Sequence, residues 1–187
     1  HGDGWLQASP EVVLKSILSD STDGDSLQMP ELRQVLSAAA AQIGHPIDLL
    51  GFDACLMAMT EVDNQAIPYA SVRVGSEKTE PGSGWPYTPI LSAIVSNPAI
   101  TPAALGTQIV DSYYASYFNS ETQSAVDLGA PYTALNTATH NLAQALITAA
   151  PDHAGEILEA RLATLEFDWD GYIDLYDFAA KVQAKVT

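Results

Sequence analysis

The stretch Ile47-Asp-Leu-Leu-Gly-Phe-Asp-Ala-Cys-Leu-Met57 decides the fold class, because a buried strand is followed there by the only cysteine of the chain. Its first half is short, apolar and rich in branched residues, which is typical of a central strand in a parallel sheet. Ligands of open α/β sheets bind outside the carboxyl ends of the strands. Asp53 and Cys55 are therefore predicted to emerge where such folds carry out chemistry.

The composition is that of a globular and strongly acidic protein. Hydrophobic residues make up 47% of its 187 residues, which is enough for one sizeable core. Asp and Glu number 23 against 7 Lys and Arg, so the formal net charge is -16. This charge argues against nucleic acid and anionic membranes as partners and favours basic peptides or divalent cations. No apolar run is long enough to cross a bilayer, and the acidic composition suits a secreted or cell-envelope protein.

The apolar periodicity predicts alternating helices and strands. Helices are expected over 11–18, 30–43, 56–62, 89–95, 101–117, 132–150 and 154–165, and strands over 47–52, 71–76 and 123–128. The loop 77–87 is dense in Gly, Pro and charge, and it follows a strand, so we expect it beside the cysteine as a binding loop. The alternation predicts an α/β fold of parallel type with a more helical C-terminal third.

A single cysteine cannot form an internal disulfide, so Cys55 is either a buried, inert thiol or a nucleophile. A cysteine nucleophile needs a histidine within hydrogen-bond reach and backbone donors for an oxyanion. His1 is the obvious candidate for the base, and the amides of Gly2 and Cys55 are candidates for the oxyanion donors. The residue pattern alone leaves both roles of the cysteine open.

Several motifs of this chain follow one another in an order shared with a known family. They are His1-Gly-Asp-Gly-Trp5, Asp48-Leu-Leu-Gly-Phe-Asp-Ala-Cys-Leu-Met57, Val74-Gly-Ser-Glu77, Pro81-Gly-Ser-Gly-Trp-Pro-Tyr87 and Tyr172-Ile-Asp-Leu-Tyr-Asp-Phe178. This order resembles the clostripain-like cysteine peptidases. The resemblance implies a caspase-like three-layer α/β/α fold with a mostly parallel sheet. Residues 1–128 would be the C-terminal part of the peptidase domain, and 129–187 a helical region packed on it.

The resemblance also assigns the catalytic pair. His1 matches the catalytic histidine, and Cys55 matches the nucleophile that forms an acyl-enzyme. The implied activity is an endopeptidase that cleaves peptides or proteins after Arg or Lys. The alternative is a degenerate, non-catalytic module of the same fold that binds peptides or calcium. Because the chain begins at His1, we expect the family's N-terminal strands to be missing, which makes that segment of the same protein an expected partner.

Substrate-binding residues are expected before the cysteine and in the loop after it. In the family, an aspartate two residues before the cysteine holds the basic side chain, and Asp53 matches it. The other candidates are Ser76, Glu77 and Ser83. Ser83 stands where the family often has a second aspartate, so arginine selectivity is less secure here. Glu77 and Glu80 could compensate in part, although each is by default a solvated surface charge.

Two further expectations concern processing and calcium. Family precursors are often cleaved between the histidine and cysteine motifs, where Lys15 is the preferred site and Arg33 the other basic residue. The stretch 166–177 matches an EF-hand loop except at its first and last positions, and 20–25 is a weaker acidic match. No cofactor is required by the predicted chemistry, and calcium is a candidate ligand. The Tyr-Ile-Asp-Leu run is itself a family motif, so the match to the EF-hand can also be a coincidence.

Overall fold

The computed structural model describes residues 16–20, 22–117 and 122–186. It contains two compact units, one over His1–Gly129 and one over Ala130–Thr187, which we treat separately. The predictions for His1, Gly2 and Lys15 fall outside the described residues.

The sheet of the N-terminal unit is mixed. Its strand order is β3 (Ile47–Gly51), β4 (Ala70–Gly75) and β5 (Ser124–Asp127). Strands β3 and β4 are parallel, whereas β5 runs antiparallel to β4. The α/β class predicted from the sequence is confirmed, and the parallel part of the described sheet is the β3–β4 pair that leads to the cysteine.

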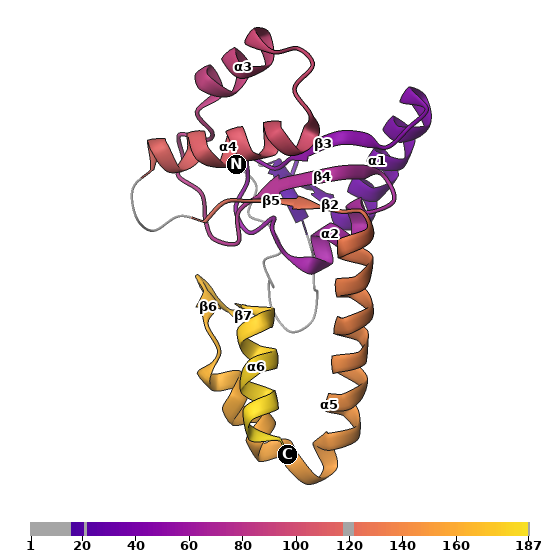
Figure 1. Ribbon diagram of the computed structural model, residues 1–187, viewed down its shortest axis with the longest axis vertical. Helices are drawn as coiled ribbons and strands as arrows, with labels where there is room; N and C mark the ends of the chain where they lie inside the picture. The colour runs from indigo at the N-terminus through magenta and orange to yellow at the C-terminus, as the bar shows by residue number, and fades with distance from the viewer. Residues whose placement is uncertain (1–15, 21, 118–121, 187) are drawn as a thin grey trace. The chain divides into compact units, whose positions relative to one another are not determined.

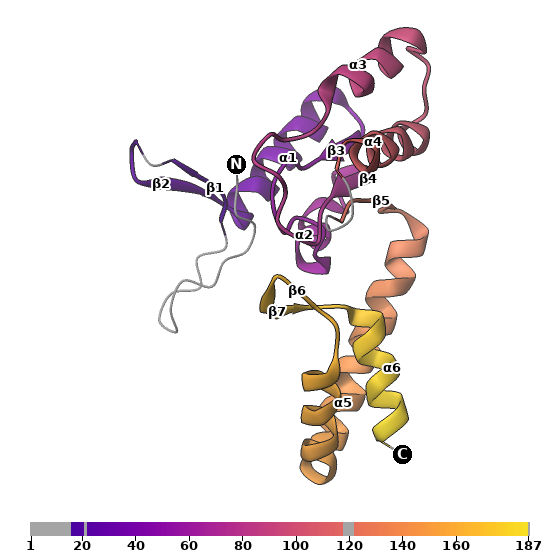
Figure 2. The ribbon, with the colours of Figure 1, turned by 90° about the vertical axis from the view of Figure 1, so that its left-hand side faces the viewer.

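Helices cover both faces of this sheet, which makes three layers (Figures 1 and 2). Helix α4 (Pro102–Ser116) lies against all three strands on one face, with α3 (Tyr87–Ser96) packed outside it. Helices α1 (Met29–Ile43) and α2 (Thr60–Ala66) pack against each other and against β3 and β4 on the other face. The order of layers is therefore α/β/α.

Helix α4 approaches the sheet closely because it carries a glycine at the contact. A Cβ atom on Gly106 would lie only 3.0 Å from the Cβ atom of Ala125 on β5. The helix begins at a threonine cap, where the Thr101 hydroxyl accepts a hydrogen bond from the Ala104 amide at 3.3 Å. The core between sheet and helices consists of Val72, Val74, Trp85, Ile90, Ile109 and Tyr113.

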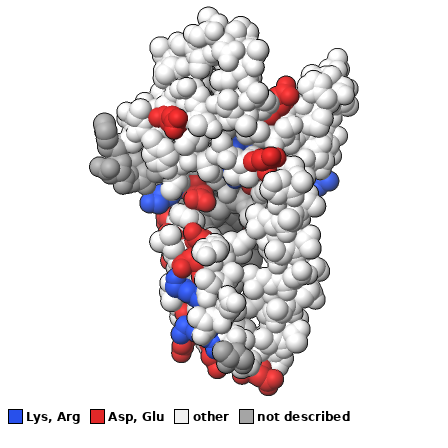
Figure 3. All heavy atoms as spheres, viewed as in Figure 1, with Lys and Arg blue, Asp and Glu red and all other residues white. Residues whose placement is uncertain are grey.

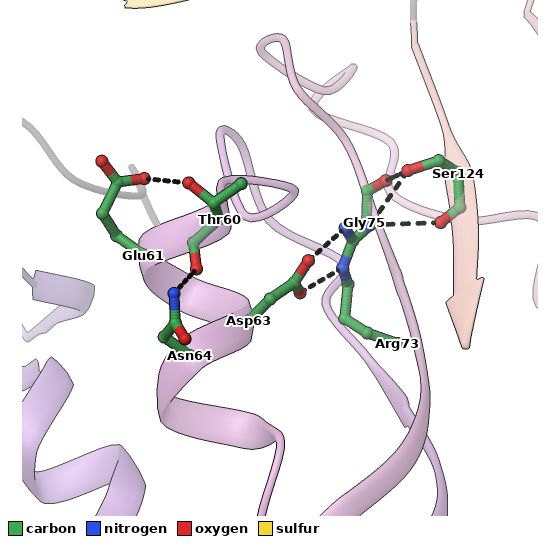
Figure 4. Close-up of polar contacts among 7 residues, drawn as sticks. All are labelled: Thr60, Glu61, Asp63, Asn64, Arg73, Gly75 and Ser124. Atoms are coloured by element: carbon green, nitrogen blue, oxygen red, sulfur yellow. Dashed lines mark hydrogen bonds and ion pairs between the residues drawn. The ribbon is translucent and has the colours of Figure 1, made fainter. Parts of the chain in front are cut away.

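A buried ion pair joins the sheet to helix α2 on the opposite face (Figure 4). Arg73 of β4 donates to both carboxylate oxygens of Asp63, with Nε–Oδ1 at 2.7 Å and a second bond at 2.8 Å. The same guanidinium donates to the Ser124 hydroxyl on β5 at 2.9 Å. Both charged side chains are almost fully buried. One guanidinium therefore holds α2, β4 and β5 together, next to the carboxyl ends where the site lies.

Two helices differ from their predicted extent. Residues Ser16–Asp20 form strand β1, which pairs antiparallel with β2 (Asp25–Gln28), so the helix predicted over 11–18 is wrong for its last three residues. Residues 22–24 lie in the turn of this hairpin, with Gly24 at φ 70°. Helix α2 begins at Thr60 instead of residue 56, because Leu56 has a left-handed φ of 59° that no α-helix accommodates.

The C-terminal unit is an antiparallel arrangement of helices with a small hairpin. Helix α5 (Ala130–Ala163) is kinked at His153, two residues after Pro151. The kink falls between the two helices predicted over 132–150 and 154–165. Strands β6 (Glu166–Phe167) and β7 (Trp169–Ile173) and helix α6 (Leu175–Lys185) follow. Lys and Arg side chains of this unit lie beside carboxylates in Figure 3. The ion pairs are Arg161–Glu166, Lys181–Asp177 and Lys185–Glu159.

The helices within the described ranges are too short or too polar to span a lipid bilayer.

Candidate functional site

The cysteine lies in an extended turn between β3 and α2. The amide of Leu56 donates to the Lys78 carbonyl at 3.0 Å, and the amide of Ala58 donates to the Ser76 carbonyl at 2.9 Å. The segment that carries Cys55 is thus tied to the first residues of the loop 77–87. The positive φ of Leu56 directly after the cysteine turns the chain away from the strand direction.

The loop also contacts the sulfur itself. The backbone N–H of Glu80 points to Cys55 Sγ, with a nitrogen–sulfur distance of 3.1 Å. Cys55 is buried, with 7% of the residue exposed. The prediction that the loop after β4 lies beside the cysteine is confirmed. The contact holds the sulfur in one position relative to the loop.

Glu80 is buried, although the sequence suggested a solvated charge. Its carboxylate accepts hydrogen bonds from Trp85 Nε1 at 3.1 Å and from Gln123 Nε2 at 3.3 Å. The Trp85 ring also lies against Gly51 of β3, where a Cβ atom would come within 3.0 Å of it. Burial raises the pKa of Glu80 to about 8, because the hydrogen bonds from Trp85 and Gln123 only partly offset desolvation and the charge of Asp53.

Asp53 lies two residues before the cysteine and is held by the other end of the loop. The Tyr87 hydroxyl donates to Asp53 Oδ2 at 2.9 Å. Desolvation, this bond and the nearby charges of Asp53 and Glu80 raise the pKa of Tyr87 to about 12. The second oxygen, Asp53 Oδ1, is buried and has no hydrogen-bond donor among the described residues. An unpaired buried carboxylate oxygen is costly, so this atom is an obvious acceptor for a ligand.

A glycine lets the loop come this close to Asp53. Gly84 has φ 68°, and a Cβ atom built on it would lie 2.8 Å from Asp53 Oδ2. Tyr117, at the end of α4, fixes this part of the loop because its hydroxyl donates to the Gly84 carbonyl and lies 2.7 Å from the Ser83 hydroxyl. Ser83 itself is exposed. It therefore lies next to the glycine that faces Asp53, where it is accessible to a substrate.

Ser76 and Glu77 occupy the start of the loop and differ in accessibility. The Ser76 side chain is fully buried, and its hydroxyl bonds to the Thr122 hydroxyl and accepts from the Lys78 amide, both at 3.0 Å. The Glu77 amide donates to the same threonine hydroxyl at 3.0 Å. Ser76 therefore supports the loop from inside, which differs from the substrate contact predicted for it. Glu77 is half-buried.

The acidic stretches do not form a metal site in the described part of the chain. No group of three or more His, Cys, Asp and Glu side chains there has the arrangement that a metal ion needs. In the EF-hand-like stretch, the Asp174 side chain caps α6 by accepting from the Asp177 amide at 2.8 Å. Asp177 pairs with Lys181 and accepts from the Leu165 amide, and these contacts lower the pKa of Asp177. The carboxylates of Asp174 and Asp177 therefore stabilise helix α6 and the residues before β6.

Sequence reasoning missed the side chains that organise the site from a distance. Gln123 and Tyr117 lie far along the chain from the cysteine, and no local pattern connects either of them with it. Glu80 looked like any other charge of a polar loop. The one available signal was the dense Gly-Pro-Trp composition around it, since a tryptophan buried under a loop needs a partner for its indole N–H.

The chain is similar to one known protein family and to several solved structures. The model of the clostripain family matches residues 1–186. Among solved structures, a secreted C11 cysteine protease from Bacteroides thetaiotaomicron, in complex with an irreversible peptide inhibitor, is 24% identical with a TM-score of 0.62. This match covers 97% of the present chain and 49% of the other.

Two further structures are more distant. A clostripain from Bacteroides thetaiotaomicron in complex with the peptide inhibitor BTN-VLTK-AOMK has a TM-score of 0.54 and 16% identity, covering 88% of this chain and 68% of that one. An inactive zymogen C11 protease from Parabacteroides distasonis has a TM-score of 0.51 and 17% identity, covering 85% and 45%. No curated protein matches the chain.

These identities establish a shared fold, and the present chain spans about half the length of the first structure it matches. The family model covers nearly the whole chain and includes the loop and cysteine described above. The chain belongs to the clostripain family.

Proposed function

We propose that the full-length protein is a cysteine endopeptidase that cleaves peptide bonds after Arg or Lys. The observation that carries this proposal is that Cys55 and Asp53 lie in the same turn after β3, both in contact with the loop 77–87. The sulfur is held by the amide of Glu80, and a buried oxygen of Asp53, two residues earlier, lacks a donor among the residues that the structure describes. A guanidinium or ammonium group supplies donors and the opposite charge, which a buried carboxylate otherwise lacks. The inhibitor bound to one family structure carries the peptide VLTK, which ends in lysine.

The proposed reaction proceeds through an acyl-enzyme. His1 takes the proton of Cys55, and the sulfur attacks the backbone carbonyl carbon of the bound basic residue, forming a C–S bond. The amides of Gly2 and Cys55 hold the oxyanion, and His1 returns the proton to the leaving amine. Water then attacks the thioester, which releases the new carboxyl end and regenerates the thiol. His1 and Gly2 enter through family resemblance.

Substrate selection is proposed to depend on Asp53, with Ser83 at the accessible edge of the same loop. Ser83 is uncharged, so Asp53 supplies the carboxylate at this edge. Glu77 adds long-range attraction for basic peptides from the start of the loop, since the net charge of the chain is -16. We further propose a secreted or cell-envelope location, in keeping with the relative that is described as secreted.

Maturation is proposed to occur by cleavage after Lys15. The competing site, Arg33, lies inside helix α1, and a peptidase needs its substrate bond in an extended conformation. Mass spectrometry of the active protein should find the bond after residue 15 cut and the bond after residue 33 intact. An active protein with both bonds intact would rule out this maturation step.

The activity is tested with two peptides that differ only in the residue before the scissile bond, arginine or its neutral isostere citrulline. In the full-length protein, Cys55→Ala should abolish cleavage of the arginyl peptide. Asp53→Asn should lower kcat/KM for the arginyl peptide by about 100-fold, because a charge-assisted contact contributes roughly 3 kcal/mol, and should leave the citrullyl peptide nearly unchanged. Binding of both peptides without cleavage would instead identify the degenerate, non-catalytic module.

A further inference from the structure

Two acidic side chains, Asp53 and Glu80, lie close to each other beside the nucleophile. Asp53 precedes the cysteine by two residues, and Glu80 follows it in the loop. Glu80 is 9% exposed, and its own backbone N–H is the group that contacts Cys55 Sγ. The residue therefore contacts the nucleophile through its main chain and the acidic pocket through its side chain.

Hydrogen-bond acceptors outnumber donors around this pair. Among the described residues, donors to the two carboxylates are Trp85 Nε1, Gln123 Nε2 and the Tyr87 hydroxyl. Asp53 Oδ1 and Gln123 Oε1 are buried and receive no hydrogen bond from described residues. Two ionised carboxylates cannot bond to each other, whereas one that is protonated has an O–H to donate. A proton held between Glu80 and Asp53 would supply the missing donor.

We propose that Glu80 and Asp53 share one proton in the free protein, and that a cationic side chain of the substrate displaces this proton when it binds. Glu80 is then a specificity-determining residue that the basic ligand itself ionises. The inference rests on the proposed function, because it assumes that the pocket takes a basic side chain. It adds a second carboxylate that becomes charged only in the complex.

The direction of the pH dependence follows from the environment of Glu80. Desolvation and the Asp53 charge favour its neutral form, and the pKa of Glu80 is raised to about 8. A bound cation favours the ionised form and lowers that pKa. At a pH between the pKa of Glu80 in the complex and its pKa in the free protein, binding releases a proton, so the affinity for a basic ligand rises with pH. Above the free-state value Glu80 is already ionised, and the affinity levels off.

Among the described residues, Cys55 and Tyr87 are the titratable groups in contact with the pair, and His1 lies outside these residues. From β3 and the turn after it come Asp53 and Cys55, and from the first turn of α3 comes Tyr87, whose pKa is raised to about 12. Gln123, directly before β5, donates to the Glu80 carboxylate and does not titrate. Tyr87 stays protonated over the range of interest. The thiol of Cys55 is removed from the measurement by working in a Cys55→Ala background.

The test is calorimetric titration of full-length Cys55→Ala protein with N-acetyl-arginine amide, in buffers of different ionisation enthalpy. Near pH 7 the proposal expects release of close to one proton per ligand bound, and none above pH 9. For a free-state value of about 8 and a complex in which Glu80 stays ionised, the affinity should rise about 20-fold from pH 6.5 to 8.5. N-acetyl-citrulline amide is the neutral control ligand and should release no proton.

Glu80→Gln, made in the same background, keeps the shape of the side chain and removes the titration. Its affinity for the arginine amide should match the parent near pH 6 and fall behind it progressively up to pH 8.5. A purely structural defect would lower the affinity by a constant factor. Tighter binding of arginine amide than of citrulline amide, without proton release in the parent protein, would overturn this inference and leave the proposed function intact. Equal binding of the two ligands would overturn both.

Discussion

Replacement of Gly84 by alanine tests whether the loop sets the position of Asp53. Gly84 has φ 68°, and a left-handed conformation costs an alanine about 1–2 kcal/mol. The new Cβ atom would lie 2.8 Å from Asp53 Oδ2 and 3.2 Å from Oδ1, so the carboxylate has to move. That movement breaks the 2.9 Å bond from the Tyr87 hydroxyl. The substitution therefore strains the backbone and displaces the acidic group.

The expected result is a loss of selectivity together with a modest loss of stability. A displaced charge-assisted contact is worth roughly 1.5–3 kcal/mol, so kcat/KM for an arginyl peptide should fall about 10- to 100-fold. A citrullyl peptide should lose much less, because it makes no ion pair. Thermal or denaturant unfolding should show a decrease of about 1–2 kcal/mol in the free energy of unfolding.

Gly82→Ala is the matched control in the same loop. A Cβ atom at this position has no neighbour within 4 Å, and Gly82 has no left-handed φ. It should behave like the parent in both assays. If Gly84→Ala kept the parent's preference for arginine over citrulline, one of two claims would be wrong. Either Asp53 does not select the substrate, or the loop does not set the position of Asp53.

Three further outcomes are expected. Asp63→Ala should lower the free energy of unfolding by about 3–5 kcal/mol, because it leaves the buried charge of Arg73 unpaired. The double variant Asp63→Leu/Arg73→Met should recover most of that loss in denaturant unfolding. Equal losses in the single and double variants would contradict the role of the pair. Ser83→Asp should raise the preference for arginyl over citrullyl peptides about 3- to 10-fold at low salt, less so at 0.5 M salt, with Ser83→Asn as the neutral control. Removal of calcium with EGTA should leave the unfolding transition unchanged, since Asp174 and Asp177 are engaged in capping and pairing; a lower transition temperature would place calcium on the chain.

The sequence predicted the elements of the site where local patterns carry enough information. The apolar run after Pro46 and the helix signal at Thr101-Pro102 are local features, and both elements formed as expected. The position of Asp53 and Cys55 after β3 follows from strand geometry alone. The loop after β4 lies beside them because parallel neighbouring strands end at the same edge of a sheet.

Features that depend on tertiary packing could not be predicted in this way. The apolar residues after Cys55 suggested a helix, but they are held by backbone bonds to the loop, and Leu56 takes a left-handed conformation. Ser16 and its neighbours have a helical apolar spacing, yet they pair with β2. Glu80 is buried because the indole N–H of Trp85 and the amide of Gln123 surround it. Gln123 and the loop carbonyls that hold Leu56 and Ala58 lie too far along the chain to form a local sequence pattern.

The central claim is that Cys55 is a nucleophile served by a pocket for basic side chains. The most direct measurement is covalent labelling of the full-length protein with a peptidyl arginyl chloromethylketone, followed by peptide mass spectrometry, in parallel with the norleucyl reagent. The account predicts alkylation at Cys55 by the arginyl reagent, at least 10-fold faster than by the neutral one, as expected for a charge-assisted contact of roughly 1.5 kcal/mol or more. Equal rates for the two reagents, or no labelling of Cys55, would contradict it.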